Sequence, residues 1–238
     1  MGEGRFRSFT TGYKETDLWV GIDPDSYLEE MKVYCFDKIK AYRKQIENYL
    51  SIDPEFGLTL KPYQTKKNAP DLALEMAIAA RKANVGPMAA VAGAFAQQLG
   101  YDLMNNFKIT EIAIENGGDI FLHLINPLVL SIFAGNSPLS GKIGIEIPKD
   151  TGYIGVCTSS GTVGPSLSFG KADAVMVACK DTALADAWAT SLGNVVQTSE
   201  DIDSVLKFTE NIQEILSLVI ICDGKVGIRG IFDLKLTK

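Results

Sequence analysis

A carboxylate and a hydroxyl lie four positions apart in one predicted helix, at Asp186 and Thr190. The helix should begin at Asp181-Thr182 and continue through small and apolar residues to Leu192. Because positions four apart share a helical face, the two oxygen-bearing side chains should project together. Magnesium takes oxygen ligands, so the pair would suit a hard cation or a phosphate-bound cation. The spacing alone favours ordinary solvent-facing residues beside a core stripe.

Two other segments combine glycines with polar side chains next to predicted strands. Asn116-Gly117-Gly118-Asp119 joins two apolar runs, at 109–115 and 120–124, which predicts a hairpin whose turn needs positive φ at both central residues. The alternative is that the glycines expose backbone N–H groups to an anion while Asp119 binds a polar group. Thr158-Ser159-Ser160-Gly161 follows another strand, where its hydroxyls could hold phosphate oxygens. Neither segment has the pattern of a P-loop or a Rossmann turn.

Histidine and cysteine offer little support for other catalytic chemistry. His123 is the only histidine, and its apolar surroundings in the sequence favour a core position. A histidine-based metal site or a Ser-His triad therefore has little to build on. Cys157 has no neighbouring base that would make it a nucleophile, so we expect a buried thiol. The four cysteines form no C-x-x-C pair, which is typical of a reducing cytoplasm.

The composition is that of a globular protein that binds neither nucleic acid nor membrane. The formal charge of the 238 residues is -6, and no block of Lys and Arg is present. The longest apolar stretch, residues 120–134, is interrupted by polar residues and Pro127 and is too short to span a bilayer. Residues 1–7 lack the apolar segment of a signal peptide. We therefore expect a cytoplasmic protein.

The periodicity of the chain predicts one α+β domain, residues 1–238, in which helices pack on antiparallel-rich sheets. No linker-like stretch and no sequence repeat divides it. The predicted helices are a long one opened by Asp23-Pro24 and continuing to Leu50, one at 70–84, one at 88–99 that Gly100 ends, the helix of Asp186, and one at 200–215. The predicted strands are a hairpin within 9–22, the two runs beside Gly117, further strands at 129–134, 142–147, 153–158 and 174–179, and a hairpin at 219–228.

Three of these segments, in this order, resemble the flavin transferase (ApbE-like) family, which moves FMN from FAD onto a protein threonine with magnesium. Residues 115–120 match its N-x-G-G-D-I segment, Thr158-Ser159-Ser160-Gly161 matches its T-S-G loop, and residues 185–193 match its A-D-A-x-x-T-x-x-x-G helix. Residues 91–96 fall where the family has I-A-K-G-Y-A. The resemblance covers roughly residues 85 to 195, and the shared order and spacing make it specific.

The resemblance implies a fold, a metal site and a ligand. The implied fold is an ApbE-like α+β architecture with antiparallel-rich β-sheets in two similar halves. A magnesium ion would be held by Asp186, Thr190 and the main-chain carbonyl of Ala92. FAD, FMN or a related nucleotide would lie across two groups of residues: Asn116, Gly117, Gly118 and Asp119, and Thr158, Ser159, Ser160 and Gly161. The implied partners are this small molecule and an acceptor or sulfur-metabolism protein, and a homodimer is a further candidate.

The chain departs from the family at two positions that bear on catalysis. Gly93 stands where the family has a lysine, and residues 164–171, Gly-Pro-Ser-Leu-Ser-Phe-Gly-Lys, stand where the family has H-I-I-D-P-x-x-G. Phosphoryl transfer depends on positioning and charge stabilisation, so losing a cation and an acid/base group should cripple it. We expect a magnesium-assisted flavin or nucleotide-phosphate binding protein with altered or lost transferase activity. The alternative is a non-catalytic accessory or binding protein, linked to sulfur assimilation.

Overall fold

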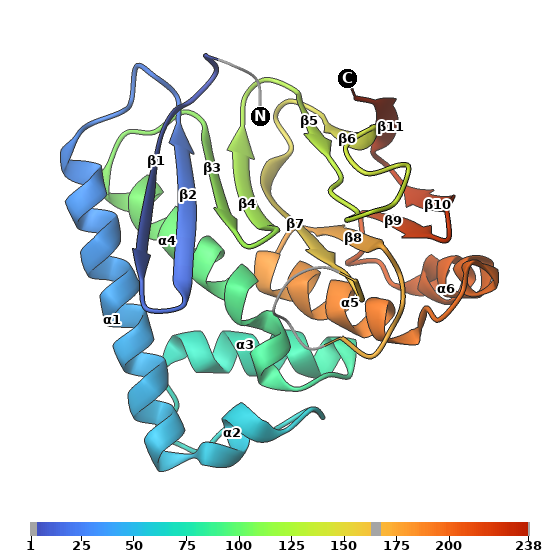
Figure 1. Ribbon diagram of the computed structural model, residues 1–238. Helices are drawn as coiled ribbons and strands as arrows, with labels where there is room; N and C mark the ends of the chain where they lie inside the picture. The colour runs from blue at the N-terminus through green and yellow to red at the C-terminus, as the bar shows by residue number, and fades with distance from the viewer. Residues whose placement is uncertain (1–3, 163–167, 238) are drawn as a thin grey trace.

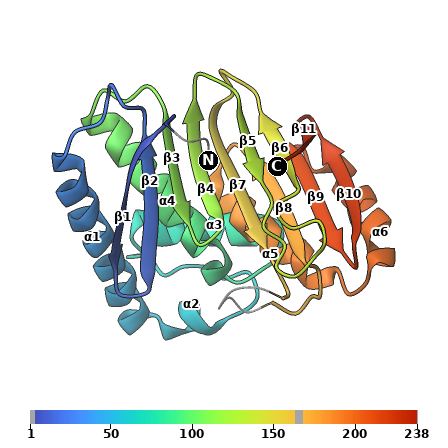
Figure 2. The same cartoon turned by 45° about the horizontal axis from the view of Figure 1, so that its top comes forward.

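Two antiparallel β-sheets and a layer of helices make up the protein, in a computed structural model that describes residues 4–162 and 168–237. The large sheet has the strand order β1-β2-β3-β4-β7-β8-β9-β10, and the small sheet has the order β11-β6-β5. The small sheet covers one face of the large sheet, and the helices cover the other (Figures 1 and 2). The predicted antiparallel-rich sheets packed with helices are thus confirmed.

The strands of the large sheet are β1 (Arg7–Tyr13), β2 (Thr16–Ile22), β3 (Ile112–Asn116), β4 (Asp119–Leu124), β7 (Gly152–Ser159), β8 (Ala174–Cys179), β9 (Ser217–Cys222) and β10 (Lys225–Gly230). Those of the small sheet are β5 (Leu128–Ser131), β6 (Ile143–Ile147) and β11 (Asp233–Leu236). The helices are α1 (Glu30–Ile52), α2 (Pro54–Leu58), α3 (Asp71–Ala83), α4 (Val91–Asn106), α5 (Thr182–Val195) and α6 (Ile202–Phe208), with 3-10 turns η1 (Pro87–Ala90), η2 (Ser199–Asp201) and η3 (Thr209–Asn211).

The central strands are apolar on both faces because each face is covered by another layer. On β4, Phe121 belongs to the core against the helices, whereas Leu122 belongs to the core between the two sheets. On β7, Cys157 and Val156 divide in the same way. Successive side chains of a strand point to opposite faces. Asp119 therefore lies on the same face as Phe121, which is the face covered by the helices.

The predicted hairpin between β3 and β4 is present, with a two-residue turn. Gly117 has φ +65° and Gly118 has φ +106°, and both are values that glycine adopts without strain. Asn116 pairs with Asp119 across the turn, and Asp119 pairs with Cys157 on the next strand. The turn thus fixes Asp119 as the first residue of a central strand.

Three sequence predictions about helices are wrong in their limits. Asp23-Pro24 does not open the long helix, which begins at Glu30; the Asp23 carboxylate instead accepts hydrogen bonds from the backbone of Ser26, Thr110 and Glu111. Gly100 does not end α4, which continues to Asn106. The glycine instead makes room for the Phe121 ring, because a Cβ at this position would lie 2.2 Å from it. The helix predicted at 200–215 is α6, a short helix flanked by two 3-10 turns.

Candidate functional site

Helix α5 carries the predicted Asp186 and Thr190 through the interior of the protein. The helix begins as predicted, with the Asp181 carboxylate accepting a hydrogen bond from the Leu184 N–H at 2.8 Å. The Asp186 side chain is buried, and Thr190 is half-buried one turn further along. The spacing-based interpretation of Asp186 as a solvent-facing residue is therefore wrong. α5 packs against α3 and α4 as well as against the sheet, so it has little exposed face.

The carboxylate of Asp186 meets the first turn of α4. Its Oδ2 accepts a hydrogen bond from the backbone N–H of Gly93 at 2.9 Å. The N–H groups of a first helical turn lack partners inside their own helix, and the positive end of the helix dipole favours a carboxylate there. The N-cap residue of α4, Ala90, has no side chain that could cap the helix. Asp186 of the neighbouring helix α5 therefore caps α4 in its place.

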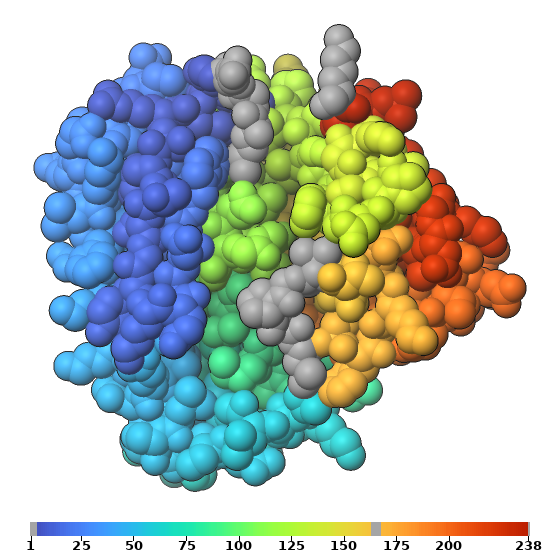
Figure 3. Space-filling view, in the orientation of Figure 1, coloured from blue at the N-terminus to red at the C-terminus, as the bar shows by residue number. Residues whose placement is uncertain are grey.

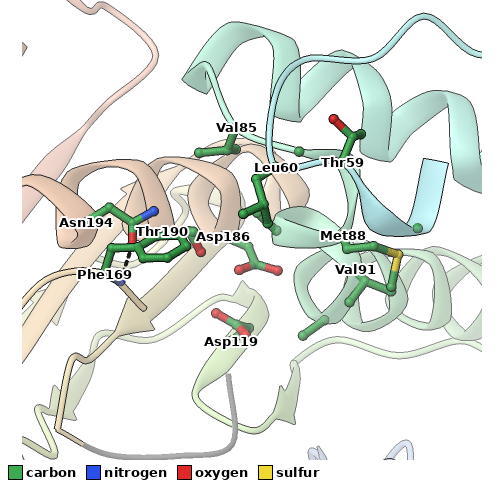
Figure 4. Close-up of a pocket in the computed structure, with 14 residues that line it drawn as sticks. Thr59, Leu60, Val85, Met88, Val91, Asp119, Phe169, Asp186, Thr190 and Asn194 are labelled. Carbon is green, nitrogen blue, oxygen red and sulfur yellow. Dashed lines mark hydrogen bonds between the residues drawn. The ribbon is translucent and has the colours of Figure 1, made fainter. Parts of the chain in front are cut away.

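Asp119 brings a second buried carboxylate to the same place. It lies at the start of β4, directly after the glycine turn, and Figure 4 shows its carboxylate and that of Asp186 pointing into the same pocket. The partner of Asp119 across the sheet is Cys157, whose thiol donates to the Thr182 carbonyl at 3.4 Å. The two acidic side chains thus come from elements that are distant in the sequence and adjacent in the fold.

The proximity of the two carboxylates disfavours charge on both. Burial raises the pKa of Asp186 to about 7, although hydrogen bonds from the backbone of Gly93 and Ala92 lower it in part. Burial and the charge of Asp186 raise the pKa of Asp119 well above its usual range. Burial also raises the pKa of the Cys157 thiol, and the prediction that this thiol is buried is confirmed.

Two pockets meet at Asp119, Asp186 and Thr190, which line both of them. The first, of about 270 Å³, continues under α2 and η1 and is largely apolar; it is named here the apolar pocket. Its other lining residues are Gly57, Thr59, Leu60, Val85, Gly86, Met88, Ala89, Val91, Ala92, Phe169 and Asn194. The second, of about 360 Å³, is named the hydroxyl pocket. Its other lining residues are Glu115, Gly117, Gly118, Ile120, Ser131, Phe133, Thr158, Ser159, Ser160 and Met176.

The segments that build these pockets come from the middle of the chain. In the space-filling view, the β1–β2 hairpin with α1 and the region of α6 and β10 form opposite flanks of the molecule (Figure 3). The green and yellow segments that contribute α4, β4 and β7 lie between them (Figure 3).

Most of the residues predicted to bind a nucleotide are brought together by the fold. Gly117, Gly118 and Asp119 line the hydroxyl pocket together with the segment Thr158–Ser160. Gly161 lines neither of the two pockets, and its backbone N–H already donates to the Ala172 carbonyl at 2.9 Å. A phosphate would find no available N–H at Gly161 in this conformation.

Asn116 and Ala92 are joined to each other. The Asn116 side-chain amide donates a hydrogen bond to the Ala92 carbonyl at 3.0 Å, and both residues line a further pocket of about 250 Å³ beneath α1. Ala92 also lines the apolar pocket. The carbonyl predicted to ligate magnesium therefore lies at the site but has the Asn116 amide as its partner.

The two departures from the family pattern have different outcomes. At Gly93 a Cβ would lie 2.5 Å from the Thr182 carbonyl oxygen and 2.8 Å from the Asp186 Cβ, so the close packing of α4 on α5 excludes any side chain. In the segment 164–171, residues 164–167 lie outside the described residues. Phe169 lies at the rim of the apolar pocket.

The donor atoms fit a hard divalent cation. Two carboxylates and a hydroxyl surround the junction of the pockets, and oxygen atoms are the ligands that magnesium prefers. Within the described part of the chain, no Lys, Arg or His lines either pocket, and no cluster of three His, Cys, Asp or Glu side chains is placed to hold a metal. A phosphate entering this acidic junction would therefore need a cation with it.

Sequence reasoning missed two features of the site. It assigned Asp119 to the ligand and did not pair it with Asp186, because no local pattern relates a turn to a distant helix. It also missed Asn194, although Asp186, Thr190 and Asn194 recur every four residues and so lie on one face of α5. Extending the four-residue spacing by one step would have found Asn194.

Searches against known proteins place the chain in a family. A family model described as "AbpE bacteria" matches residues 1–227. A UPF0280 protein from Methanocella arvoryzae is 41% identical over 82% of this chain and 79% of its own length. A UPF0280 protein from Methanococcus vannielii is 40% identical over 90% of this chain and 87% of its own length.

Solved structures named ApbE have a similar fold. The apo flavinyl transferase ApbE from Pseudomonas stutzeri superposes with a TM-score of 0.60 over 98% of this chain and 94% of that one, at 12% identity. An ApbE protein from Thermotoga maritima superposes with a TM-score of 0.59 over 94% of this chain and 96% of that one, also at 12% identity. In the part of the chain that the structure describes, no helix has the length and apolarity needed to cross a bilayer. The chain thus belongs to the AbpE bacteria family and has the fold of the flavin transferase ApbE.

Proposed function

We propose that this protein binds a flavin nucleotide, FAD or FMN, together with a magnesium ion at the junction of the two pockets. The observation that carries the proposal is the facing pair of buried carboxylates, Asp119 and Asp186, between pockets large enough for the parts of a nucleotide. Two like charges held in a buried site are costly, and a divalent cation between them removes that cost.

Asp186, Thr190 and Asp119 would hold the ion, and the Ala92 carbonyl would join them if Asn116 turned away from it. A bound magnesium ion would neutralise phosphate charge and polarise a phosphoryl oxygen. The chain itself would fix the orientation of the ligand. The Gly117-Gly118 turn and the hydroxyls of the segment Thr158–Ser160 line the wall where ribityl, ribose or phosphate oxygens could be bound.

The fold and the resemblance favour a flavin transferase, but the pocket favours an altered reaction. The lining residues of both pockets, as far as the structure describes them, provide no lysine or histidine to act as a cation or an acid/base group. Packing at Gly93 leaves no space for a lysine there. The second candidate is therefore a non-catalytic flavin-binding protein. In either case the resemblance implies a protein partner, which would be an acceptor protein or a protein of sulfur metabolism.

Two measurements test the proposal. Calorimetric titration of the wild-type protein with FAD should show binding that is much tighter with magnesium than with a chelator, and Asp186→Asn should lose most of that difference. Incubation with FAD, magnesium and a threonine-bearing acceptor protein, followed by mass spectrometry of the acceptor, should show no efficient FMN addition. Magnesium-independent FAD binding would contradict the metal site, and stoichiometric FMN addition within minutes would contradict the altered reaction.

A further inference from the structure

One largely exposed aromatic side chain lines each pocket. Phe169 at the apolar pocket is 57% exposed, and Phe133 at the hydroxyl pocket is 66% exposed. A phenyl ring gains free energy when it leaves water, so a ring fixed at a pocket rim is suited to contact a ligand.

The backbone of Phe169 is attached to the end of α5 from both sides. Its N–H donates to the Asn194 side-chain oxygen at 2.9 Å, and its carbonyl accepts from the Gln197 side-chain amide at 2.9 Å. The next residue, Gly170, lies so close to the Gly193 carbonyl that a Cβ would approach it to 1.8 Å. Lys171 then donates to the Val196 carbonyl at 2.8 Å. The backbone that carries the Phe169 ring is therefore held against the end of α5.

Asn194 connects this ring to the carboxylates. It lies one turn beyond Thr190 and two turns beyond Asp186 on the same face of α5, and Figure 4 shows the Phe169 ring beside Thr190 with Asn194 bonded to its backbone. One helical face thus presents the proposed metal ligands and, at its end, the residue that holds the ring. A ring stacked on Phe169 would lie within one or two turns of a phosphate at Asp186.

The chemistry of the two pockets distinguishes which ring would lie here. Leu60, Val85, Met88 and Val91 line the pocket of Phe169, whereas hydroxyls and the Glu115 carboxylate line the pocket of Phe133. An isoalloxazine carries an apolar dimethylbenzene edge, which suits the first lining. An adenine or a ribose carries amino and hydroxyl groups, which suit the second.

Resting on the proposed function, we infer that Phe169 is a stacking platform for the isoalloxazine ring and that Asn194 and Gln197 are positioning residues for Phe169. This assigns the apolar pocket to the flavin ring and makes Phe169 a determinant of specificity for flavins over other phosphate-bearing ligands. Stacking of a flat ring on an aromatic side chain is strong enough to matter in solution, because its loss typically weakens binding by about tenfold or more.

The test measures dissociation constants for FMN and for ADP, each with magnesium, by calorimetry. Phe169→Ala should weaken FMN binding by about tenfold and leave ADP binding within about twofold, while Phe169→Tyr should retain FMN binding. Phe208→Ala is the matched control, because Phe208 is a similarly exposed phenyl ring (63%) on α6 that lines neither pocket, and its loss should leave FMN binding unchanged. Phe133→Ala removes the ring of the hydroxyl pocket and tests the alternative placement of the isoalloxazine. Gln197→Ala is the test of positioning: Gln197 lines neither pocket, and its side-chain amide donates to the carbonyls of Phe169 and Asn194. Weaker FMN binding with unchanged ADP binding would therefore arise through the contacts that hold Phe169 at the end of α5.

The outcomes separate this inference from the function on which it rests. Wild-type protein that binds neither FMN nor ADP in the presence of magnesium overturns both. Wild-type protein that binds FMN, with Phe169→Ala binding it equally well, overturns the platform alone. Equal losses for FMN and ADP in Phe169→Ala, or a loss of FMN binding in Phe133→Ala only, would also overturn it, because the ring would then lie elsewhere.

Discussion

The Asp186 carboxylate accepts a hydrogen bond from the Gly93 backbone N–H at 2.9 Å, so one side chain both caps α4 and faces Asp119. A residue that served only a metal could be removed without cost to the folded protein. Asp186 has a second role in joining two buried helices. Substitutions at Asp186 must therefore be chosen so that stability and metal binding can be separated.

We expect Asp186→Ala and Asp186→Asn to differ in stability. The alanine leaves the buried Gly93 N–H without an acceptor, which should lower the free energy of unfolding by about 1–3 kcal/mol relative to the asparagine. The asparagine keeps an oxygen for that hydrogen bond and removes the buried charge. Urea unfolding in the absence of metal, followed by circular dichroism, measures the free energy of unfolding of each variant. Equal midpoints for the two variants would show that the hydrogen bond to Gly93 does not stabilise the protein.

Asp119→Asn should raise the stability of the metal-free protein and weaken its response to magnesium. The substitution removes one of two buried like charges while preserving the shape of the side chain. The thermal shift caused by magnesium and FAD together should become smaller, because ligand binding to the folded state raises its stability and the proposed ligand set has lost one member. Glu30→Gln, which removes a charge from an exposed position of α1 that lines neither pocket, is the control. A full magnesium-dependent shift in Asp119→Asn would exclude Asp119 as a ligand.

Stability without metal should fall as the pH rises toward neutrality. The folded pKa of Asp186 is raised from its ordinary 3.8 to about 7, so between these values the folded protein retains a proton that the unfolded chain has lost. Each retained proton costs about 1.4 kcal/mol of stability per pH unit across that window, and the effect ends above about pH 7. Asp186→Asn should show a shallower decline when unfolding is measured from pH 4.5 to 8. Identical pH profiles for wild type and variant would contradict the raised pKa.

Magnesium affinity should change with pH in the opposite direction. A metal ion must displace the shared proton from the carboxylates, so binding should tighten by up to about tenfold per pH unit below pH 7 and level off above it. Calorimetry in two buffers of different ionisation enthalpy would detect the released proton directly. Affinity that is constant from pH 5.5 to 8 would show that the metal does not displace this proton.

Gly93→Ala should destabilise the protein by about 1–3 kcal/mol, since the new Cβ would overlap the Thr182 carbonyl. Gly93→Lys should be at least as costly and should not create FMN transfer, because the side chain cannot enter the space between α4 and α5. Gln98→Ala, a half-buried position on the same helix, is the control for helix substitution. A Gly93→Lys variant with wild-type stability would show that the helices can separate at this point.

Local sequence patterns predicted the elements well where the local chemistry determines the structure. The turn at Gly117-Gly118 and the cap at Asp181 are examples, because each depends on a few neighbouring residues. The predictions from local patterns were wrong where packing against a distant segment determines the structure. Gly100 resembles a helix stop in the sequence, yet the Phe121 ring packs against it and the helix continues.

The candidate site shows the same division between local and distant information. The motif resemblance placed Asp186 and Thr190 on one helix and Gly117 to Asp119 in one turn, and the structure brings both groups to the same junction. The burial of Asp186, its bond to Gly93 and its pairing with Asp119 depend on how α5 packs against α4 and the sheet. No spacing within a single segment carries that information.

The two-residue turn at Gly117-Gly118 also limits how this family could diverge. Inserting one residue after the turn without a compensating bulge would exchange the faces of every side chain along β4. The inserted residue would then take the place of Asp119 on the side of the helices, and the Asp119 carboxylate would be buried among the apolar side chains between the two sheets. A descendant with a longer turn would have to lose the acidic pair or rebuild it from another strand. The two-residue length of this turn is thus a condition for keeping the Asp119 carboxylate beside Asp186.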